Sequence, residues 1–195
     1  MALPKYKLYI TLEEYIEGEK ESHVKHEYID GQVYAMAGAS DKHNRISLNI
    51  AARLDNHLRG NGCEAFMSDM KVVIEEILSY YPDVMVTWDD PIPSAYYRTE
   101  PCLIVEVLSP SSERIDRYEK LTSYRRIEAL QEYVLVAQER MQVEVYRRQA
   151  NNQWTHEVFT ELEDEARFDS VNLTMTLRDI YRNVRWQDGE ESIAT

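Results

Sequence analysis

Runs of apolar residues along the chain predict several β-strands, and two of these runs are nearly uninterrupted. Residues 101–108 (PCLIVEVL) and 132–138 (EYVLVAQ) carry apolar side chains at most positions, which is typical of strands covered on both faces. Residues 83–88 (DVMVTW) follow Pro82 and predict a further strand, because proline is tolerated where a strand starts. Together these segments predict a central sheet that is buried on both sides.

Two segments show the three- to four-residue spacing of amphipathic helices. In residues 41–59 apolar residues recur every four positions, and Gly60 follows as a stop signal. Residues 114–130 follow an SPSS sequence and carry apolar side chains at three-residue steps, which predicts a helix that buries them. These apolar positions are Ile115, Tyr118, Leu121 and Tyr124. One helix before the core strands and one between them indicate an α/β domain.

The first part of the chain predicts a short helix followed by a β-hairpin. Residues 11–18 open with a capping-box pattern of Thr11 and Glu14, and we expect this helix to stop at Gly18. Residues 24–36 hold an Asp-Gly pair between two β-favouring runs. That arrangement is the strongest short-range signal for a hairpin.

The remaining segments complete a mixed α/β (α+β) pattern. We expect one strand over residues 64–78 and a closing hairpin formed by residues 142–148 and 154–160. Residues 173–184 (LTMTLRDIYRNV) are compatible with either a strand or a short helix. No repeat or linker interrupts this order, so the pattern predicts a single sheet-based domain.

Length and composition agree with one folded domain. The chain has 195 residues, within the roughly 100–200 residues of a typical domain. We expect residues 1–184 to form it and residues 185–195 to form a polar tail. No apolar run approaches the roughly 20 residues of a membrane helix, and the N-terminus lacks the apolar stretch of a signal peptide. The two cysteines, Cys63 and Cys102, fit buried, reduced thiols of a cytoplasmic protein.

The charge balance argues against a general nucleic-acid binder. The formal net charge is −13, whereas such binders usually carry a basic patch or a high pI. A phosphate backbone would be repelled at long range. Any contact with DNA must therefore come from a local basic strip or from metal ions.

A carboxylate stands where the pattern predicts burial. Glu106 lies inside the apolar run 103–108, and burying it is costly unless a cation or hydrogen-bond donors meet it. Asp83 opens the preceding strand. Two neighbouring strands that each supply a carboxylate would suit a hard divalent cation such as Mg²⁺, which prefers oxygen ligands. An internal ion pair for Glu106 and an ordinary Pro-Asp turn remain open alternatives.

A third candidate lies on the helix that follows Glu106. Asp116, Lys120 and Tyr124 are spaced four residues apart, so they share one helix face. The side chain of Lys120 can reach back toward the N-terminal end of that helix, and we expect its ammonium to approach Glu106 or Asp83. The alternative is a surface Asp-Lys pair of about 0.3–0.5 kcal/mol.

An ordered series of residues resembles one nuclease family. The series comprises Glu27 in HEYIDG, His43 opening a predicted helix, Pro82-Asp83, Glu106 in IVEVLSPSS, and Asp116, Lys120 and Tyr124 in DRYEKLTSY. It resembles the Uma-type restriction endonuclease family of the PD-(D/E)xK nuclease superfamily, over nearly the whole chain. The resemblance implies a restriction-endonuclease-like fold, in which helices flank a central mixed sheet next to an N-terminal β-hairpin. It also implies divalent-metal-dependent cleavage of DNA.

The resemblance also assigns roles to individual residues. Asp83 and Glu106 match the family's metal-binding acidic pair, which implies Mg²⁺ or Mn²⁺ as the cofactor. The superfamily's usual lysine lies two residues after the second acid, where this chain has Leu108. Lys120 matches a lysine that has moved to the following helix, and Glu27 matches the acidic residue before the hairpin turn. The implied catalytic set is therefore these two carboxylates, Lys120 and Glu27.

Three other residues of the series, His43, Asp116 and Tyr124, are additional candidates. Two further function classes stay open. The acidity and the displaced lysine favour a catalytically idle DNA- or protein-binding module, and a structural protein with internal ion pairs is the other alternative. For the nuclease we expect a homodimer, because cutting both strands generally needs two active sites and most soluble oligomers are two-fold dimers.

Overall fold

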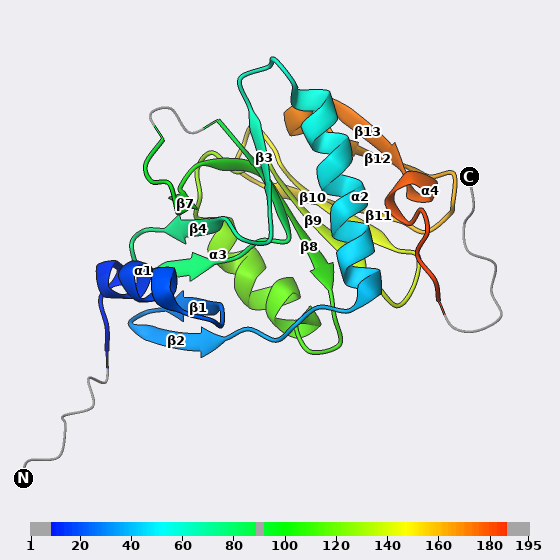
Figure 1. Ribbon diagram of the computed structural model, residues 1–195. Helices are drawn as coiled ribbons and strands as arrows, with labels where there is room; N and C mark the ends of the chain where they lie inside the picture. The colour runs from blue at the N-terminus through cyan, green and yellow to red at the C-terminus, as the bar shows by residue number, and fades with distance from the viewer. Residues whose placement is uncertain (1–8, 89–91, 187–195) are drawn as a thin grey trace, which may run out of the picture.

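The computed structural model describes residues 9–88 and 92–186, whose strands form three sheets (Figure 1). In spatial order, the larger sheet contains β11 (Trp154–Phe159), β10 (Val143–Arg148), β9 (Glu132–Ala137), β8 (Pro101–Leu108), β6 (Val84–Thr87) and β3 (Glu64–Met67). The smaller sheet contains β2 (Gln32–Ala35), β1 (His26–Ile29), β5 (Leu78–Tyr80), β4 (Lys71–Ile74) and β7 (Tyr97–Arg98). The third is the pair β12 (Glu165–Phe168) and β13 (Leu173–Thr176).

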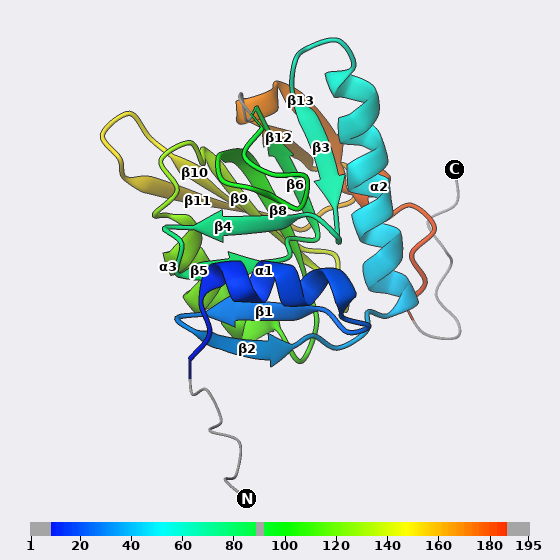
Figure 2. The ribbon, with the colours of Figure 1, turned by 60° about the vertical axis from the view of Figure 1, so that its left-hand side comes forward.

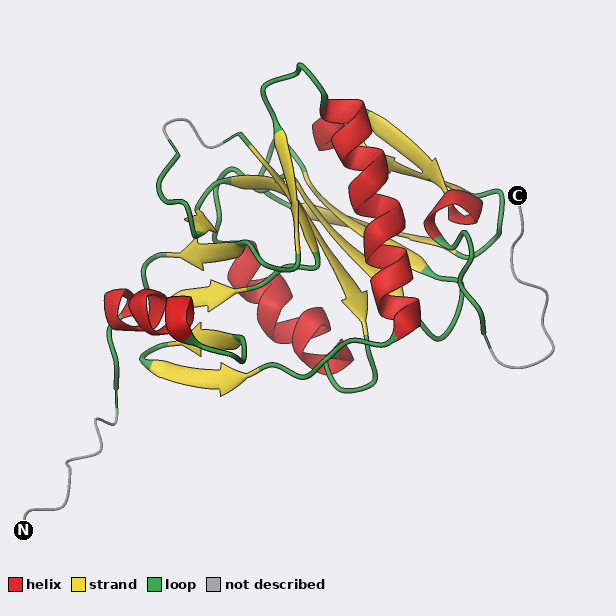
Figure 3. Ribbon diagram, in the orientation of Figure 1, coloured by secondary structure: helices red, strands yellow, loops and turns green. Residues whose placement is uncertain are grey.

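The helices cover and separate these sheets (Figure 3). They are α1 (Leu12–Glu21), α2 (Asp41–Leu58), the π-helix η1 (Ile115–Lys120), α3 (Leu121–Tyr124), the 3-10 helix η2 (Asp169–Val171) and α4 (Leu177–Ile180). No helix within the described ranges is long and apolar enough to cross a membrane.

The layers follow from three apolar clusters. One cluster joins α2 and α4 to one face of the larger sheet, and a second joins the other face to α3 and the smaller sheet. A third, small cluster holds α1 on β1. Figure 2 shows α1 lying on the smaller sheet, next to β1. The segment η1–α3 therefore packs between the two sheets through Leu121 and Tyr124.

Strands β8 and β9 form the centre of the larger sheet. Every residue of both strands is buried, which confirms the prediction of strands covered on both faces. β8 pairs antiparallel with β6 and parallel with β9. The predicted central mixed sheet is therefore present, with its carboxylate-bearing strand in the middle.

Several local predictions are confirmed. The predicted helix over residues 41–59 is α2, and the closing hairpin is β10–β11. β1 and β2 form the predicted N-terminal hairpin, whose turn residues Asp30 and Gly31 have φ angles of 45° and 83°. Residues 173–184 contain both of the expected alternatives, first β13 and then α4.

Two boundary predictions are wrong. The capping box of Thr11 and Glu14 is present, but α1 continues through Gly18 to Glu21, because an isolated glycine weakens a helix without ending it. The single strand expected over residues 64–78 is divided between two sheets as β3, β4 and β5. Ser68 has a φ of 57°, and this left-handed residue turns the chain from the larger sheet into the smaller one.

The helix predicted over residues 114–130 is shorter than expected, since its helical residues end at Tyr124, and it also differs in part of its buried face. Ile115 and Tyr118 are exposed, the latter by 68%, whereas Asp116 and Lys120 are buried. The first turns are π-helical, and the two buried charges form an ion pair. Leu121 and Tyr124 do pack against the core as predicted. Apolar periodicity predicts the wrong residues only in the first turns, where mutual pairing compensates for the burial of charge.

Two other expectations have mixed outcomes. Cys102 is buried, but Cys63 is only half-buried, and both thiols are free. Of the predicted polar tail, residues 187–195 lie outside the described residues. The division into a domain over 1–184 and a tail over 185–195 stays a prediction.

Candidate active site

The candidate site lies where β8 ends and β6 begins. The antiparallel register pairs Val84 with Val105, and one further step places Asp83 opposite Glu106, on the same face of the sheet. The smaller sheet supplies Glu27 from β1. The first turn of α2 and the π-helix η1 close the site from two other directions.

Lys120 is the centre of the site. Its Nζ atom lies 3.0 Å from Glu27 Oε1, 3.1 Å from Glu106 Oε1 and 3.2 Å from Asp116 Oδ1. The hydroxyl of Tyr124 donates to the same Glu106 oxygen at 2.8 Å. Carboxylates from β1, β8 and η1 therefore converge on one ammonium group, and α3 adds a hydroxyl on Glu106.

The neighbouring carboxylate, Asp83, is held from two sides. The backbone N–H of Val107 donates to Asp83 Oδ2 at 2.7 Å, and His43 Nε2 lies 3.2 Å from that oxygen. Ser40 is the N-cap of α2, and its hydroxyl accepts from the N–H of His43 at 3.1 Å. The cap therefore fixes the helix turn that presents the imidazole.

The π-helix explains how two charged side chains face inward. The backbone oxygen of Asp116 accepts a hydrogen bond from the Tyr133 hydroxyl at 3.0 Å, which ties the widened turn to β9. π-turns inside helices occur frequently at functional sites. Here the turn directs both Asp116 and Lys120 toward Glu106.

The site has a closed floor and a more accessible rim. Glu106, Asp116, Lys120 and Tyr124 are buried, with Glu106 only 3% exposed. The other members, Glu27, Asp83 and His43, keep side-chain exposures of 14–17%. A substrate would approach over these rim residues.

The electrostatics of the site are dominated by negative charge. Four carboxylates meet one ammonium and one imidazole. Burial raises the pKa of Glu106 well above its usual range; Lys120 lowers it, while Asp116 and Asp83 raise it further. Burial alone would lower the pKa of Lys120, but Glu106, Glu27 and Asp116 raise it well above its ordinary value. Lys120 therefore stays protonated at neutral pH.

The imidazole is affected in a similar way. Burial lowers the pKa of His43, but its interaction with Asp83 raises it, and the net direction is upward. The protonated imidazole is thereby favoured beside this carboxylate.

The oxygen-rich donor set fits a hard divalent cation. Asp116 Oδ1 is buried without a hydrogen-bond partner, although the Lys120 ammonium lies nearby. Within the described residues no three His, Cys, Asp or Glu side chains already stand in a metal-holding arrangement. The Lys120 ammonium contacts Glu27, Glu106 and Asp116, whereas Asp83 contacts His43 and the N–H of Val107. A metal would therefore be added between Asp83 and Glu106.

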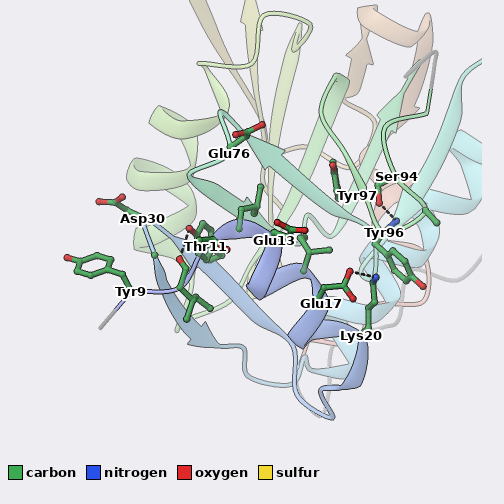
Figure 4. A pocket seen from close by; sticks show the side chains of 16 residues that line it. Tyr9, Thr11, Glu13, Glu17, Lys20, Asp30, Glu76, Ser94, Tyr96 and Tyr97 are labelled. Atoms are coloured by element: carbon green, nitrogen blue, oxygen red, sulfur yellow. Dashed lines mark hydrogen bonds and ion pairs between the residues drawn. The ribbon is translucent and has the colours of Figure 1, made fainter. Parts of the chain in front are cut away.

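A separate cavity of about 910 Å³ lies away from this cluster (Figure 4). It is bounded by α1, the β1–β2 turn and residues 94–97, and none of the seven candidate residues lines it. Its charged lining residues are Glu13, Glu17, Lys20, Asp30 and Glu76. An opening lined mainly by acids does not favour a phosphate, so the Lys120 cluster is the better candidate for phosphate chemistry.

All seven residues selected from the sequence are brought together by the fold. Sequence analysis missed three supporting groups, namely the N–H of Val107, the hydroxyl of Tyr133 and Ser40. Ser40 directly precedes the predicted helix and is recognisable as an N-cap. The other two have no signal in a single sequence, because their roles depend on strand register.

Comparison with protein families identifies the chain. Residues 12–183 match the Uma2 family, described as "Putative restriction endonuclease". The chain belongs to the Uma2 family. This match spans the elements from α1 to α4, and so includes every member of the candidate site.

Other proteins match this chain over most of their length. Two uncharacterized proteins of Synechocystis sp., slr1290 and sll1609, are 38% and 39% identical to this chain, over 90% and 80% of it and 93% and 89% of their own lengths. The crystal structure of a putative nuclease belonging to DUF820 from Anabaena variabilis superposes with a TM-score of 0.73 at 22% identity. It covers 88% of this chain and 97% of that one. The expected restriction-endonuclease-like fold is thereby confirmed.

Proposed function

We propose that this Uma2 protein is a divalent-metal-dependent endonuclease that hydrolyses DNA phosphodiester bonds. The observation that carries this proposal is the convergence of Lys120 with the Glu27, Glu106 and Asp116 carboxylates, beside Asp83. The carboxylates at this strand end would hold a metal cation, and the buried Lys120 ammonium would supply a positive charge to a phosphate. Family membership and fold support the same class of chemistry.

In this proposal Asp83 and Glu106 would hold Mg²⁺ or Mn²⁺. A divalent ion there supplies a Lewis acid, lowers the pKa of water and neutralises phosphate charge. The protein fixes both carboxylates in advance: the N–H of Val107 and His43 orient Asp83, and Tyr124 orients Glu106.

Lys120 would act on the substrate directly. Its ammonium can orient the attacking water and stabilise negative charge that develops on the phosphate oxygens as one P–O bond forms and another breaks. Glu27 and Asp116 keep this ammonium protonated and in position. Glu27 also lies at the rim, where it can complete the polar shell around the reacting group.

Metal binding and cleavage test the proposal together. We expect isothermal titration calorimetry to show Mn²⁺ binding to the wild type and to show little or none for Asp83→Ala or Glu106→Ala, because each substitution removes one proposed ligand. The wild type should nick or linearise supercoiled plasmid in Mg²⁺ or Mn²⁺ and not in EDTA. Equal binding heats in all three proteins would contradict the metal assignment. Metal binding without cleavage of any DNA would favour the idle module.

The homodimer also stays a prediction. If both strands are cut by paired sites, static light scattering at micromolar concentration should give a mass near twice 23.0 kDa. A mass near that of a single chain would contradict it. The measurement needs no DNA, so it is independent of activity.

A further inference from the structure

The proposed substrate poses an electrostatic problem. DNA is densely negative, and this chain has a formal net charge of −13. Binding therefore requires a place where cations are locally available. One such place lies beside the candidate site, where three lysines surround Tyr81 and Tyr96.

Lys71, on β4, is the innermost of these lysines. It is 5% exposed, and its Nζ atom lies 5.0 Å from the centre of the Tyr81 ring and 3.5 Å from the backbone oxygen of Tyr96. No carboxylate in the described ranges lies within ion-pair distance of it. The nearby acid Glu19 instead accepts from the Tyr81 hydroxyl and pairs with His26.

This arrangement leaves a buried cation without a compensating anion. Burial lowers the pKa of Lys71; Glu19 and Asp69 raise it from a distance, and Lys20 lowers it further. An unpaired buried charge is expensive in a folded protein. A ligand anion would remove that cost.

Two more exposed lysines flank Lys71. Lys25 lies 5.6 Å from the centre of the Tyr81 ring, and Lys20 lies 4.7 Å from that of Tyr96. Their carboxylate partners are the exposed side chains of Asp69 and Glu17. Exposed ion pairs of this kind contribute about 0–1 kcal/mol, so Lys25 can exchange Asp69 for a phosphate, whereas Lys20 and its partner Glu17 line the acidic cavity of Figure 4.

Lys25 is linked to the candidate site through Ser68. Lys25 Nζ donates to the backbone oxygen of Ser68 at 3.1 Å, and the N–H of Ser68 donates to the backbone oxygen of Asp83 at 3.1 Å. Lys25 also lies two residues before Glu27. Lys25 is therefore joined through a single residue to the backbone of Asp83, on the side of the candidate site where Asp83 and Glu27 lie.

We propose that Lys71 and Lys25 form a phosphate-binding subsite for the DNA backbone, next to the phosphate that is cleaved. This inference rests on the proposed function, since it takes DNA as the substrate. The contact is made to the backbone and carries no sequence information. It supplies the local basic strip that an acidic nuclease needs.

Salt dependence of binding tests the subsite. Fluorescence anisotropy with a short labelled duplex in EDTA measures affinity without cleavage. Each phosphate contact contributes about 0.9 to the slope of log K against log salt. Lys71→Met and Lys25→Met should each reduce that slope by about 0.9 and weaken binding several-fold, equally for unrelated sequences.

A matched control separates a local contact from a change in net charge. Arg59 lies just beyond the far end of α2 and pairs only with exposed Asp55 among the described residues. Arg59→Gln removes the same unit of charge and should leave the slope unchanged. An equal decrease in all three variants would overturn the subsite, as would a failure of the wild type to bind DNA.

Thermal stability provides a second measurement. If the charge of Lys71 serves to bind a ligand anion, the unfolding temperature of Lys71→Met should equal or exceed that of the wild type, because the substitution removes an uncompensated buried charge. A lower midpoint together with an unchanged salt slope would show a purely structural lysine. If the wild type cleaves DNA with metal but the lysine variants keep the wild-type salt slope, the subsite alone is rejected. If the variants show a reduced slope but the wild type never cleaves, only the nuclease proposal is rejected.

Discussion

Replacing Glu106 by Gln is expected to reduce metal-dependent cleavage on the order of a thousand-fold, about 4 kcal/mol of barrier, without destabilising the protein. The substitution removes a proposed metal ligand but keeps the size of the side chain. Ionising this buried carboxylate is unfavourable, since burial raises its pKa, so a neutral amide costs little. Lys120 keeps Glu27 and Asp116 as partners. Plasmid cleavage and differential scanning calorimetry measure the two effects.

Glu132→Gln is the matched control for this variant. Glu132 is a fully buried glutamate of the same sheet, and it pairs with Arg147 and accepts from Ser170. The register places it opposite Leu103, at the other end of β8 from Glu106. We expect Glu132→Gln to lower the unfolding temperature and to retain cleavage. If both variants lose stability alike and both still cut DNA, Glu106 is a structural ion-pair partner.

Removing the central cation should have a different signature. Lys120→Ala is expected to reduce cleavage by about 10²–10³-fold while Mn²⁺ binding is largely retained, because lysine is not a metal ligand. It should also destabilise the fold by about 3–5 kcal/mol near neutral pH, since it leaves buried carboxylates uncompensated. Lys120→Arg should restore much of the stability and little of the cleavage, because a planar guanidinium does not replace a compact ammonium.

The stability cost of Lys120→Ala should depend on pH. The folded pKa of Glu106 lies above its unfolded value, so its contribution to stability is fully present below the unfolded pKa and is lost as pH rises through the folded pKa. Without the ammonium this pKa rises further. Urea unfolding should therefore show a smaller penalty near pH 5 than near pH 8, and a penalty independent of pH would contradict the ion-pair account.

Patterns within one segment predicted much of the fold. The Asp-Gly turn, the four-residue apolar spacing of α2 and the continuous apolar run of β8 each have a local physical cause, and all three are present. Glu106 was found because it stands in an apolar run, Asp83 because it opens a neighbouring strand, and the residues of η1 and α3 because of their four-residue spacing. The remaining two, Glu27 and His43, were found because the order of the series resembles a family. None of these signals required knowledge of long-range contacts.

The errors arise where distant partners decide the local structure. Ile115 and Tyr118 were expected to be buried, but the inward face of η1 carries Asp116 and Lys120. Lys120 meets Glu106 and Glu27 there and also pairs with Asp116. The single strand expected over 64–78 is divided because its two halves pair in different sheets. Lys71 gave no signal, since an unpaired buried cation is recognisable only once its neighbours are known.

The assembly of the site from both sheets has a consequence for biosynthesis. Glu27 arrives from the smaller sheet and Glu106 from the larger one, while Lys120 follows both in the chain. During synthesis the carboxylates therefore leave the ribosome before the ammonium that joins them. Contacts between residues so far apart in sequence form late, because the chain entropy of closing long loops must be overcome first. Under the proposed function, a nascent or partly unfolded chain would be unable to cut DNA, and cleavage would begin only when folding is complete.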